Sequence, residues 1–475
     1  MNLTGQIAKN TSFHLGGKII SLFLSLATFA FIARYLGQAG FGQFTTIMAY
    51  LQAFAIFSDL GLYMIFIQML SQPGADEKIL ASNFFTFRIV SSLALLTFGV
   101  LLSLFIPQYS HLIKIGIAIT AISFLFGSLI QLLTGFFQKK LQIMRVVYAE
   151  LMGRIILVSL VVLAIYFDLG FYFILGAIVI GGFIHFLLLY LFSLKFIIFK
   201  FRFDFSLWID IFKKTWPVGL SIILTTIYFK GDTIILSLFK SSEEVGIYGA
   251  AYRMLEALIM LPPIFMGLVL SPLSRAWLEK DFSGFKEIFQ QSFDFFMVLI
   301  IPLIVGVLFL AEPLMVLVAG EEFAVSSQPL KILIFATAFI FLGSLVTHTI
   351  IAMEKQKSML KFYFLSAAIA LIGYLFFIPK YSYTGAAYIT VAVEFLVTFF
   401  AFMIIWQTIK FFPSLRILFR ALLAGLIMGV VLYFLIGINL FLLIILSILV
   451  YFISLYFLKG ISKKTIKEIL SLKQK

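Results

Sequence analysis

The sequence consists largely of long apolar runs in which hydrophobic and polar residues do not alternate, residues 440–458 being one example. A helix needs ~20 mostly apolar residues to cross the hydrocarbon core of a bilayer. The strands of a membrane β-barrel alternate apolar with polar residues, which these runs do not. Because 63% of the residues are hydrophobic and only 12% are charged, a soluble fold could not bury so much apolar surface. The predicted fold class is therefore an all-α integral membrane protein.

Fourteen transmembrane helices account for the length of the chain. Divided among fourteen spans, 475 residues give about 34 residues for each helix with its loop, which leaves no soluble domain. The first apolar run could also be a cleaved signal peptide, but the loop after it lacks a clear small-residue cleavage site. The expected spans are residues 10–33, 43–70, 83–106, 112–137, 146–167, 171–195, 213–238, 246–274, 286–311, 326–352, 359–379, 383–409, 415–436 and 439–458.

The basic residues predict the orientation of the spans, because cytoplasmic loops collect Lys and Arg. With the N-terminus in the cytoplasm, 25 of the 35 basic residues lie on the cytoplasmic side, five lie outside and five lie within spans. We therefore expect a multi-pass protein of the cytoplasmic (inner) membrane with both termini in the cytoplasm. The net charge of +14 then reflects membrane orientation, and we expect no nucleic-acid partner. The tail 459–475 is either an amphipathic helix on anionic lipids or a solvated segment.

A segment near the start of the chain matches a second segment in the later half. A shift of 204 residues (246 − 42) superposes Gly42 on Gly246, Phe41 on Val245 and Phe44 on Tyr248. Transporters often consist of two structurally related halves. We therefore predict two six-helix lobes around a central cavity, residues 1–200 and 201–412. Residues 413–475 would add helices thirteen and fourteen and a basic cytoplasmic tail.

Three of the five cations within the predicted spans are candidates for a binding site, because ionisable groups there are costly and usually functional. They are Lys18, Lys230 and Arg253. If the lobes face each other, these side chains would form a cationic chamber suited to binding phosphate groups. The alternative is that Lys230 is neutralised by Asp232 and Arg253 by Glu256. For the first pair this is disfavoured, because residues i and i+2 do not face each other on a helix.

Other charges within the spans have weaker claims to function. Asp59 and Glu394 could carry a coupling proton or cation, or could form structural hydrogen bonds between helices. Glu150 and Arg154 are spaced i, i+4 and are expected to pair on one helix. Arg88 lies about two turns from the cytoplasmic end of its span, and its side chain could extend to the interface.

The sequence carries no signature of an enzyme. It contains no P-loop, no dinucleotide-binding glycine pattern and no metal-ligand cluster. It has no cysteine, which excludes thiolate metal sites and cysteine catalysis. We therefore predict no catalytic residues, no metal and no cofactor.

Several loose motifs, spread over residues 34–390, resemble a known family in their order and spacing. The segments are Arg34-Tyr35-Leu36-Gly37, Phe41-Gly42-Gln43-Phe44, Asp59-Leu60-Gly61, Asp232-Thr233-Ile234-Ile235-Leu236, Val245-Gly246-Ile247-Tyr248, Ala251-Tyr252-Arg253, Pro262, Pro272, Met353-Glu354-Lys355-Gln356-Lys357, Pro379-Lys380-Tyr381 and Gly385-Ala386-Ala387. Together they resemble the polysaccharide-biosynthesis flippases of bacteria and archaea, which include O-antigen repeat-unit translocases. Their superfamily also contains the lipid II flippase and the multidrug antiporters.

The resemblance implies two bundles of six helices around a central cavity, with two helices added at the end. It also implies outward movement of polyprenyl-diphosphate-linked sugars by alternating access. The lipid II flippase is similar in placing essential cations on helices one and eight, where Lys18 and Arg253 are the matching positions. The match of Lys18 rests on helix position alone. Helix two carries Asp59 rather than a cation, so the whole charge pattern is not carried over.

The favoured interpretation is thus a flippase for a polyprenyl-diphosphate-linked oligosaccharide in cell-surface polysaccharide assembly. Lys18, Lys230 and Arg253 would bind the diphosphate, and Asp59, Asp232, Glu256 and Glu394 would couple an ion or pair with these cations. Its partners would be that substrate, membrane lipids, H⁺ or Na⁺, and glycan polymerase machinery. The alternatives are a drug or organic-cation antiporter of the same fold and a membrane glycan polymerase or ligase.

Overall fold

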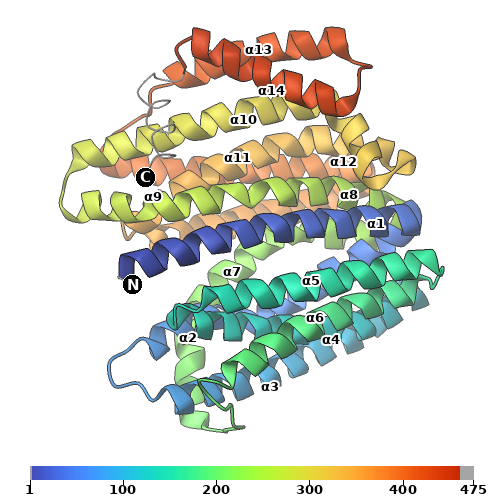
Figure 1. Cartoon of the computed structure of the whole chain (residues 1–475), viewed down its shortest axis with the longest axis vertical. Coiled ribbons are helices and arrows are strands. Elements are labelled where there is room, and N and C mark those ends of the chain that lie inside the picture. Colours follow the sequence, from blue (N-terminus) through green and yellow to red (C-terminus); the bar gives the residue numbers. More distant parts are fainter. Residues whose placement is uncertain (1–2, 461–475) are drawn as a thin grey trace. The chain divides into compact units, whose positions relative to one another are not determined.

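A computed structural model of the chain describes the backbone of residues 3–460, which fold almost entirely into helices, and the side chains of residues 16–216 and 219–460 (Figure 1). The tail predicted to be basic lies outside these residues from position 461 onward. The helices are α1 (Leu3–Asp59), α2 (Leu62–Leu70), α3 (Glu77–Leu104), α4 (His111–Lys139), α5 (Ile143–Tyr166), α6 (Phe171–Ser193), α7 (Phe205–Phe239), α8 (Ser242–Ile259), α9 (Leu261–Leu278), α10 (Phe282–Ala319), α11 (Ser327–Ala352), α12 (Leu360–Ile409), α13 (Arg416–Leu435) and α14 (Leu440–Phe457), with two 3-10 helices at Glu321–Ser326 and Gln356–Met359.

Twelve helical segments of the described chain are long and apolar enough to cross a membrane. The all-α membrane fold predicted from the sequence is therefore confirmed. Two of the twelve, Gly16–Leu70 and Gln356–Ile409, hold 55 and 54 residues. A straight helix of that length would extend for about 80 Å, more than twice the ~30 Å of the hydrocarbon core.

Helix α1 is bent back on itself at Gly37, which accounts for its length. The backbone there has φ 63° and ψ −177°, a conformation that glycine adopts without strain. The ring centroids of Phe29 and Phe41 are 5.4 Å apart, whereas twelve residues of straight helix would separate them by about 18 Å. The loop predicted between residues 33 and 43 is thus reduced to one bend.

Helix α12 contains the second bend, at Ser382, where φ is 52°. Gly385 packs so closely on the preceding turn that a Cβ there would lie 2.7 Å from the carbonyl oxygen of Phe377. In a straight helix these two residues would be about 12 Å apart. The predicted count of fourteen spans is therefore two higher than the number of continuous segments, and these two bends account for the difference.

Short polar residues set the starts of several helices, as expected where backbone N–H groups lack helical partners. The Asp76 carboxylate accepts hydrogen bonds from the N–H groups of Lys78 and Ile79 at the start of α3. The Asp204 carboxylate accepts one from Leu207 N–H at the start of α7. These capping residues lie at the ends of the apolar runs, where the helices leave the expected hydrocarbon region.

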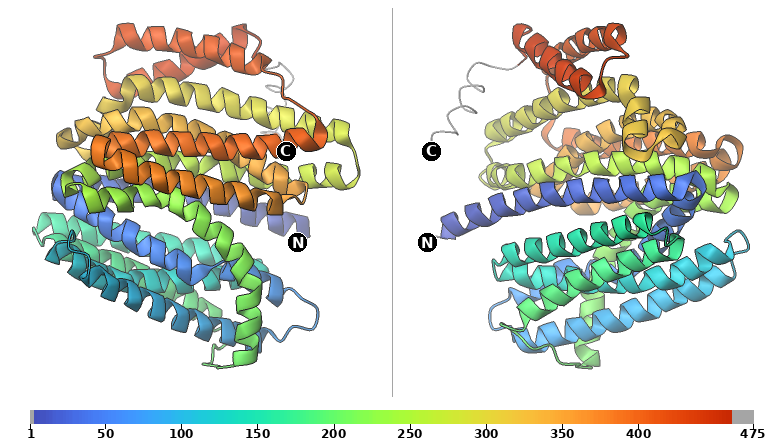
Figure 2. Two further views of the ribbon diagram at one scale, coloured as in Figure 1. Left: turned by 180° about the vertical axis from the view of Figure 1, so that it is seen from behind. Right: turned by 45° about the vertical axis from the view of Figure 1, so that its right-hand side comes forward.

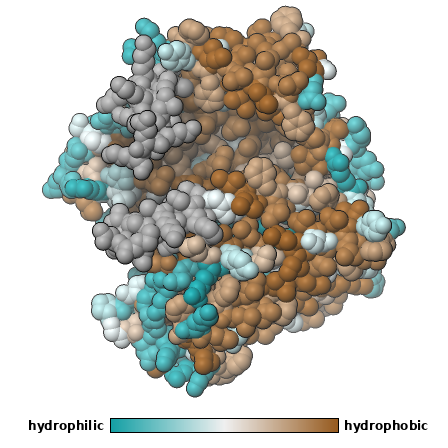
Figure 3. Space-filling view, viewed as in Figure 1, coloured by the Kyte–Doolittle hydropathy of each residue, from teal (hydrophilic) through white to brown (hydrophobic). Residues whose placement is uncertain are grey.

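The side chains on the outside of the molecule match a lipid environment. In Figure 3 most of the visible surface is hydrophobic, and hydrophilic residues gather near the ends of the helices. On α13, Leu426 is 67% exposed and Phe434 is 77% exposed. A protein surrounded by water would not present so many large apolar side chains. The chain is accordingly a multi-pass membrane protein.

The described chain divides into two compact units, which we treat separately. The first contains residues 3–249, 318–322 and 370–386, and the second contains residues 250–317, 323–369 and 387–460. In the first unit α4, α5 and α6 run alongside one another (Figure 2). Helices α5 and α6 approach closely where Gly153 has no Cβ: a Cβ there would lie only 2.8 Å from the carbonyl oxygen of Gly181. The predicted lobes 1–200 and 201–412 stay a prediction.

The first unit also contains the two glycines that the internal match superposes. A Cβ on Gly42 would lie 1.6 Å from the carbonyl oxygen of Ser242, and a Cβ on Gly246 would lie 2.1 Å from that of Gln38. The shift of 204 residues relates Gln38 to Ser242 just as it relates Gly42 to Gly246. The two contacts are therefore equivalent under the repeat, and α1 crosses the start of α8 backbone against backbone. We name the four residues Gln38, Gly42, Ser242 and Gly246 the glycine crossing.

In the second unit α13 and α14 form a hairpin that packs on α10. The Tyr451 hydroxyl donates a hydrogen bond to the Val298 carbonyl at 3.0 Å. The side chain of Ile301 packs against Gly425, where a Cβ would lie only 2.7 Å from Ile301 Cγ2. The core of this contact is apolar and includes Met428 and Leu432, both 2% exposed or less.

Candidate functional site

A carboxylate of the first unit accepts hydrogen bonds from three donors on two helices. Glu150 of α5 accepts a hydrogen bond from the Lys18 ammonium of α1 at 3.2 Å through Oε2. Its Oε1 accepts from the Ser21 hydroxyl at 2.6 Å and from Arg154 Nε at 3.4 Å. We call these four residues the Glu150 cluster. It combines two cations with one carboxylate and so carries a formal excess of positive charge.

Local sequence and two small residues place these groups together. Lys18 and Ser21 are spaced i, i+3 on α1, and Glu150 and Arg154 are spaced i, i+4 on α5, so each pair shares one helix face. Helices α1 and α5 approach closely beside the cluster, where Gly17 has no Cβ. A Cβ there would lie only 2.1 Å from the side chain of Val147. The Glu150–Arg154 pair forms as its spacing predicted.

The cations of the cluster are open while its acceptor is enclosed. The side chains of Lys18 and Arg154 are each 36% exposed, whereas that of Glu150 is 14% exposed. Ser21 is buried at 3%. On α6, His185 lies near the cluster, and its Nε2 is buried without a hydrogen-bond partner among the side chains that the structure describes. An anion reaching this site would therefore meet the ammonium and the guanidinium first.

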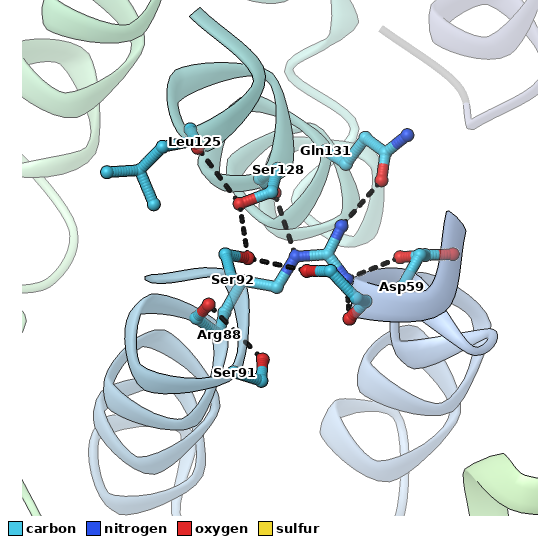
Figure 4. A network of polar contacts seen from close by, with 8 residues as sticks. Asp59, Arg88, Ser91, Ser92, Leu125, Ser128 and Gln131 are labelled. Atoms are coloured by element: carbon cyan, nitrogen blue, oxygen red, sulfur yellow. Dashed lines mark hydrogen bonds and ion pairs between the residues drawn. The ribbon is translucent and has the colours of Figure 1, made fainter. Parts of the chain in front are cut away.

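A second ionic network in the first unit is closed, and Figure 4 shows it. Arg88 of α3 donates from Nη1 to Asp59 Oδ1 at 2.6 Å and to the Ser58 carbonyl at 3.3 Å. It also donates from Nη2 to Gln131 Oε1 at 2.7 Å and from Nε to the Ser128 carbonyl at 3.2 Å. Arg88 is 2% exposed, so the expectation that its side chain extends to the interface was wrong.

This network braces a break between α1 and α2. The backbone leaves the helix at Leu60 and Gly61, whose φ angles are 43° and 81°. Arg88 supplies a donor to the Ser58 carbonyl just before the break. Irregular backbone at membrane depth is tolerated where protein satisfies its polar groups. Asp59 is therefore ion-paired to Arg88, and its coupling role stays a prediction.

Lys230 and Asp232 both lie buried in α7. Asp232 is fully enclosed and accepts hydrogen bonds from the Tyr248 hydroxyl at 2.6 Å and from Thr233 N–H at 2.6 Å. Lys230 is 9% exposed and lies 5.8 Å from the ring centroid of Phe229. Tyr248 belongs to the repeat motif, but nothing in the sequence indicated that its hydroxyl would contact Asp232.

Arg253, Glu256 and Glu394 lie in the second unit. Arg253 Nη1 and Glu256 Oε2 are 2.8 Å apart, so the pairing that their spacing allowed is present. The Arg253 side chain is nevertheless 43% exposed. Glu394 of α12 is buried at 6%. Lys18 and Lys230 share the first unit, and the convergence of all three cations on one cavity stays a prediction.

Solved structures show which class of protein has this fold. The chain is similar to "Lipid II flippase MurJ, inward closed conformation" with a TM-score of 0.78 and 17% identity, covering 94% of this chain and 98% of that one. It is also similar to an inward-facing multidrug resistance MATE family transporter of the MOP superfamily, with a TM-score of 0.64 and 14% identity over 84% of this chain and 99% of that one. For a MOP superfamily transporter from Pyrococcus furiosus the TM-score is 0.56 and the identity is 15%, with 86% of this chain and 96% of that one covered. The fold is therefore that of the MOP superfamily transporters.

Two family profiles match the sequence and identify its family within this fold class. The profile described as "Polysaccharide biosynthesis protein" matches residues 7–276, more than half of the chain. The MatE profile matches residues 217–376. The chain belongs to the polysaccharide biosynthesis protein family. The comparison with curated proteins gives no match.

Proposed function

We propose that this protein is an alternating-access flippase that moves a polyprenyl-diphosphate-linked oligosaccharide from the inner to the outer leaflet of the cytoplasmic membrane. The product would serve assembly of a cell-surface polysaccharide such as an O-antigen. Family membership and the likeness in fold to a lipid II flippase support the transport of a lipid-linked sugar. In this proposal both termini lie in the cytoplasm, and the transport step involves no bond chemistry.

The Glu150 cluster is the observation that carries the proposal. Two partly exposed cations, Lys18 and Arg154, lie on membrane-spanning helices, where an unpaired charge is costly. Ammonium and guanidinium groups both donate strong hydrogen bonds to phosphate oxygens. A diphosphate headgroup would satisfy both, while the polyprenyl chain stayed in lipid. Lys230 and Arg253 are proposed as further contacts for the same headgroup.

A membrane potential would assist this direction of transport. Moving one elementary charge across 100 mV changes the free energy by about 2.3 kcal/mol. With the cytoplasm negative, an anionic headgroup is driven outward. Asp59 and Glu394 remain candidates for a coupled H⁺ or Na⁺, and membrane lipids and glycan polymerase machinery remain the proposed partners.

An organic-cation antiporter is the second candidate, because solved multidrug transporters share the fold. A chamber for organic cations would be expected to expose carboxylates or aromatic rings. At the Glu150 cluster the opposite holds, since the carboxylate is the more enclosed group. This arrangement favours an anionic substrate.

The test of the proposal is translocation in sealed proteoliposomes. A fluorescent polyprenyl-diphosphate oligosaccharide would be followed with a quencher that does not cross the bilayer. Lys18→Ala should reduce the initial rate about tenfold or more, because it removes a charge-assisted hydrogen bond to the headgroup. The matched control is Arg275→Ala, which removes an exposed cation paired with Glu279. Equal rates for wild type, Lys18→Ala and protein-free vesicles would contradict the proposal.

A further inference from the structure

The three donors around Glu150 are all groups that can donate hydrogen bonds to a phosphate. An ammonium, a hydroxyl and a guanidinium converge on one carboxylate. Carboxylate and phosphate oxygens accept the same charge-assisted hydrogen bonds. An anionic headgroup that reaches Lys18 and Arg154 therefore competes with Glu150 for the same donors.

The contacts of Glu150 with these cations are loose enough to exchange. Arg154 approaches Glu150 only through Nε at 3.4 Å, and this is its one hydrogen bond among residues 16–216 and 219–460, whose side chains the structure describes. The Lys18 ammonium, which has three donors, uses one of them in the same part of the chain. Both side chains are more than one-third exposed.

Arg88 shows the contrasting arrangement in the same unit. Its guanidinium makes four hydrogen bonds, and its side chain is 3% exposed. The Arg88 guanidinium is thus closed to a ligand, whereas the Asp59 side chain is 20% exposed. The exposure of the cations therefore separates a structural pair, whose guanidinium is closed, from a cluster whose cations are open to an incoming anion.

We infer that Glu150 is a resident counter-anion, which the substrate diphosphate displaces from Lys18 and Arg154 and which reclaims both cations when the substrate leaves. This inference rests on the proposed function and adds a regulating residue to it. Two cations without a counter-charge would hold a diphosphate tightly, and transport requires a site from which the substrate also leaves. Glu150 weakens binding and speeds release, and it leaves neither cation unpaired within the membrane.

The first measurement is the affinity of purified protein for farnesyl diphosphate in detergent, with farnesol as the uncharged control ligand. Glu150→Gln keeps the shape of the side chain and removes its charge. It should bind farnesyl diphosphate about tenfold more tightly than wild type, a typical size for coupling between two sites. Its affinity for farnesol should not change. Lys18→Ala should bind farnesyl diphosphate more weakly than wild type.

Two further variants keep the result interpretable. Glu279→Gln removes a carboxylate from an exposed pair with Arg275 and should leave affinity unchanged. Glu150→Asp keeps the charge but shortens the side chain, so it should tighten binding about threefold as its hydrogen bonds lengthen. It serves in place of Glu150→Gln if that variant does not fold. In proteoliposomes, Glu150→Gln should release substrate more slowly and transport it more slowly at saturation.

The outcomes separate the inference from the proposed function. If Lys18→Ala weakens binding of farnesyl diphosphate but neither Glu150 variant binds it more tightly than wild type, the counter-anion role is overturned and the cationic site stands. If wild type and Lys18→Ala bind farnesyl diphosphate equally, the proposed site itself is contradicted. Tighter binding with a lower rate of transport supports the inference.

Discussion

At the scale of single residues, the charges in the membrane divide into closed and open arrangements. Arg88 is closed by Asp59, Gln131 and two backbone carbonyls. Lys18 and Arg154 are open and share one carboxylate. The first arrangement stabilises a break in a helix, and the second is the site proposed for the substrate headgroup.

Replacement of Arg88 by Met should destabilise the protein without a direct effect on substrate binding. The change leaves Asp59 without its cation, and breaking a buried ion pair costs about 3–5 kcal/mol. Thermal unfolding in detergent would show a lower midpoint. The double variant Arg88→Met with Asp59→Leu should recover part of the loss, because no buried charge is left unpaired. A double variant as unstable as Arg88→Met alone would contradict this view of the network.

Sequence predicted those contacts that depend on one helix only. Glu150–Arg154 and Arg253–Glu256 follow from spacings of four and three residues. Lys18 reaches Glu150 across 132 positions, and Arg88 reaches Asp59 across 29. Such contacts depend on which helices pack together and at what depth. A single apolar sequence carries little information on either, because hydrophobic residues occupy both the lipid-facing and the protein-facing sides of a membrane helix.

At the scale of elements, the bends and crossings are set by small or irregular residues. The bends at Gly37 and Ser382 fall where the sequence predicted loops, and the separations of α5 from α6 and α13 from α14 also fall where expected. The breaks between α1 and α2 and between α8 and α9 were missed. The first falls at Ser58-Asp59-Leu60-Gly61, a polar interruption too short to end a span, and the second lies in the apolar run 257–261, where hydropathy alone gives no signal.

The glycine crossing offers a test of movement between α1 and α8. Next to it, a Cβ on Gly249 would lie 3.1 Å from Thr45 Cβ, and a disulfide needs a separation of about 3.5–4.5 Å. The chain has no cysteine, so Thr45→Cys with Gly249→Cys introduces the only thiols. Oxidation should form the disulfide and stop transport, because alternating access requires the crossing to open. Reduction should restore it, and the single variants serve as controls. Full transport by quantitatively cross-linked protein would contradict an opening here.

At the scale of the whole molecule, the excess of basic residues in alternate loops predicts a single orientation. Cysteines placed in two exposed loops test it in whole cells. Gln108→Cys should react with a membrane-impermeant maleimide, whereas Glu279→Cys should react only after permeabilisation. Labelling of position 279 in intact cells would contradict the proposed topology. The membrane potential would then drive the anion in the opposite direction relative to the protein.

The most direct test of the account compares two substrates in the same proteoliposomes under an imposed potential. The wild-type protein should translocate a polyprenyl-diphosphate oligosaccharide, and the rate should rise when the compartment that the anion leaves is made negative. It should not move an organic cation such as ethidium against a proton or sodium gradient. Ion-driven movement of ethidium, with no translocation of the diphosphate lipid at any potential, would contradict the flippase and establish the antiporter.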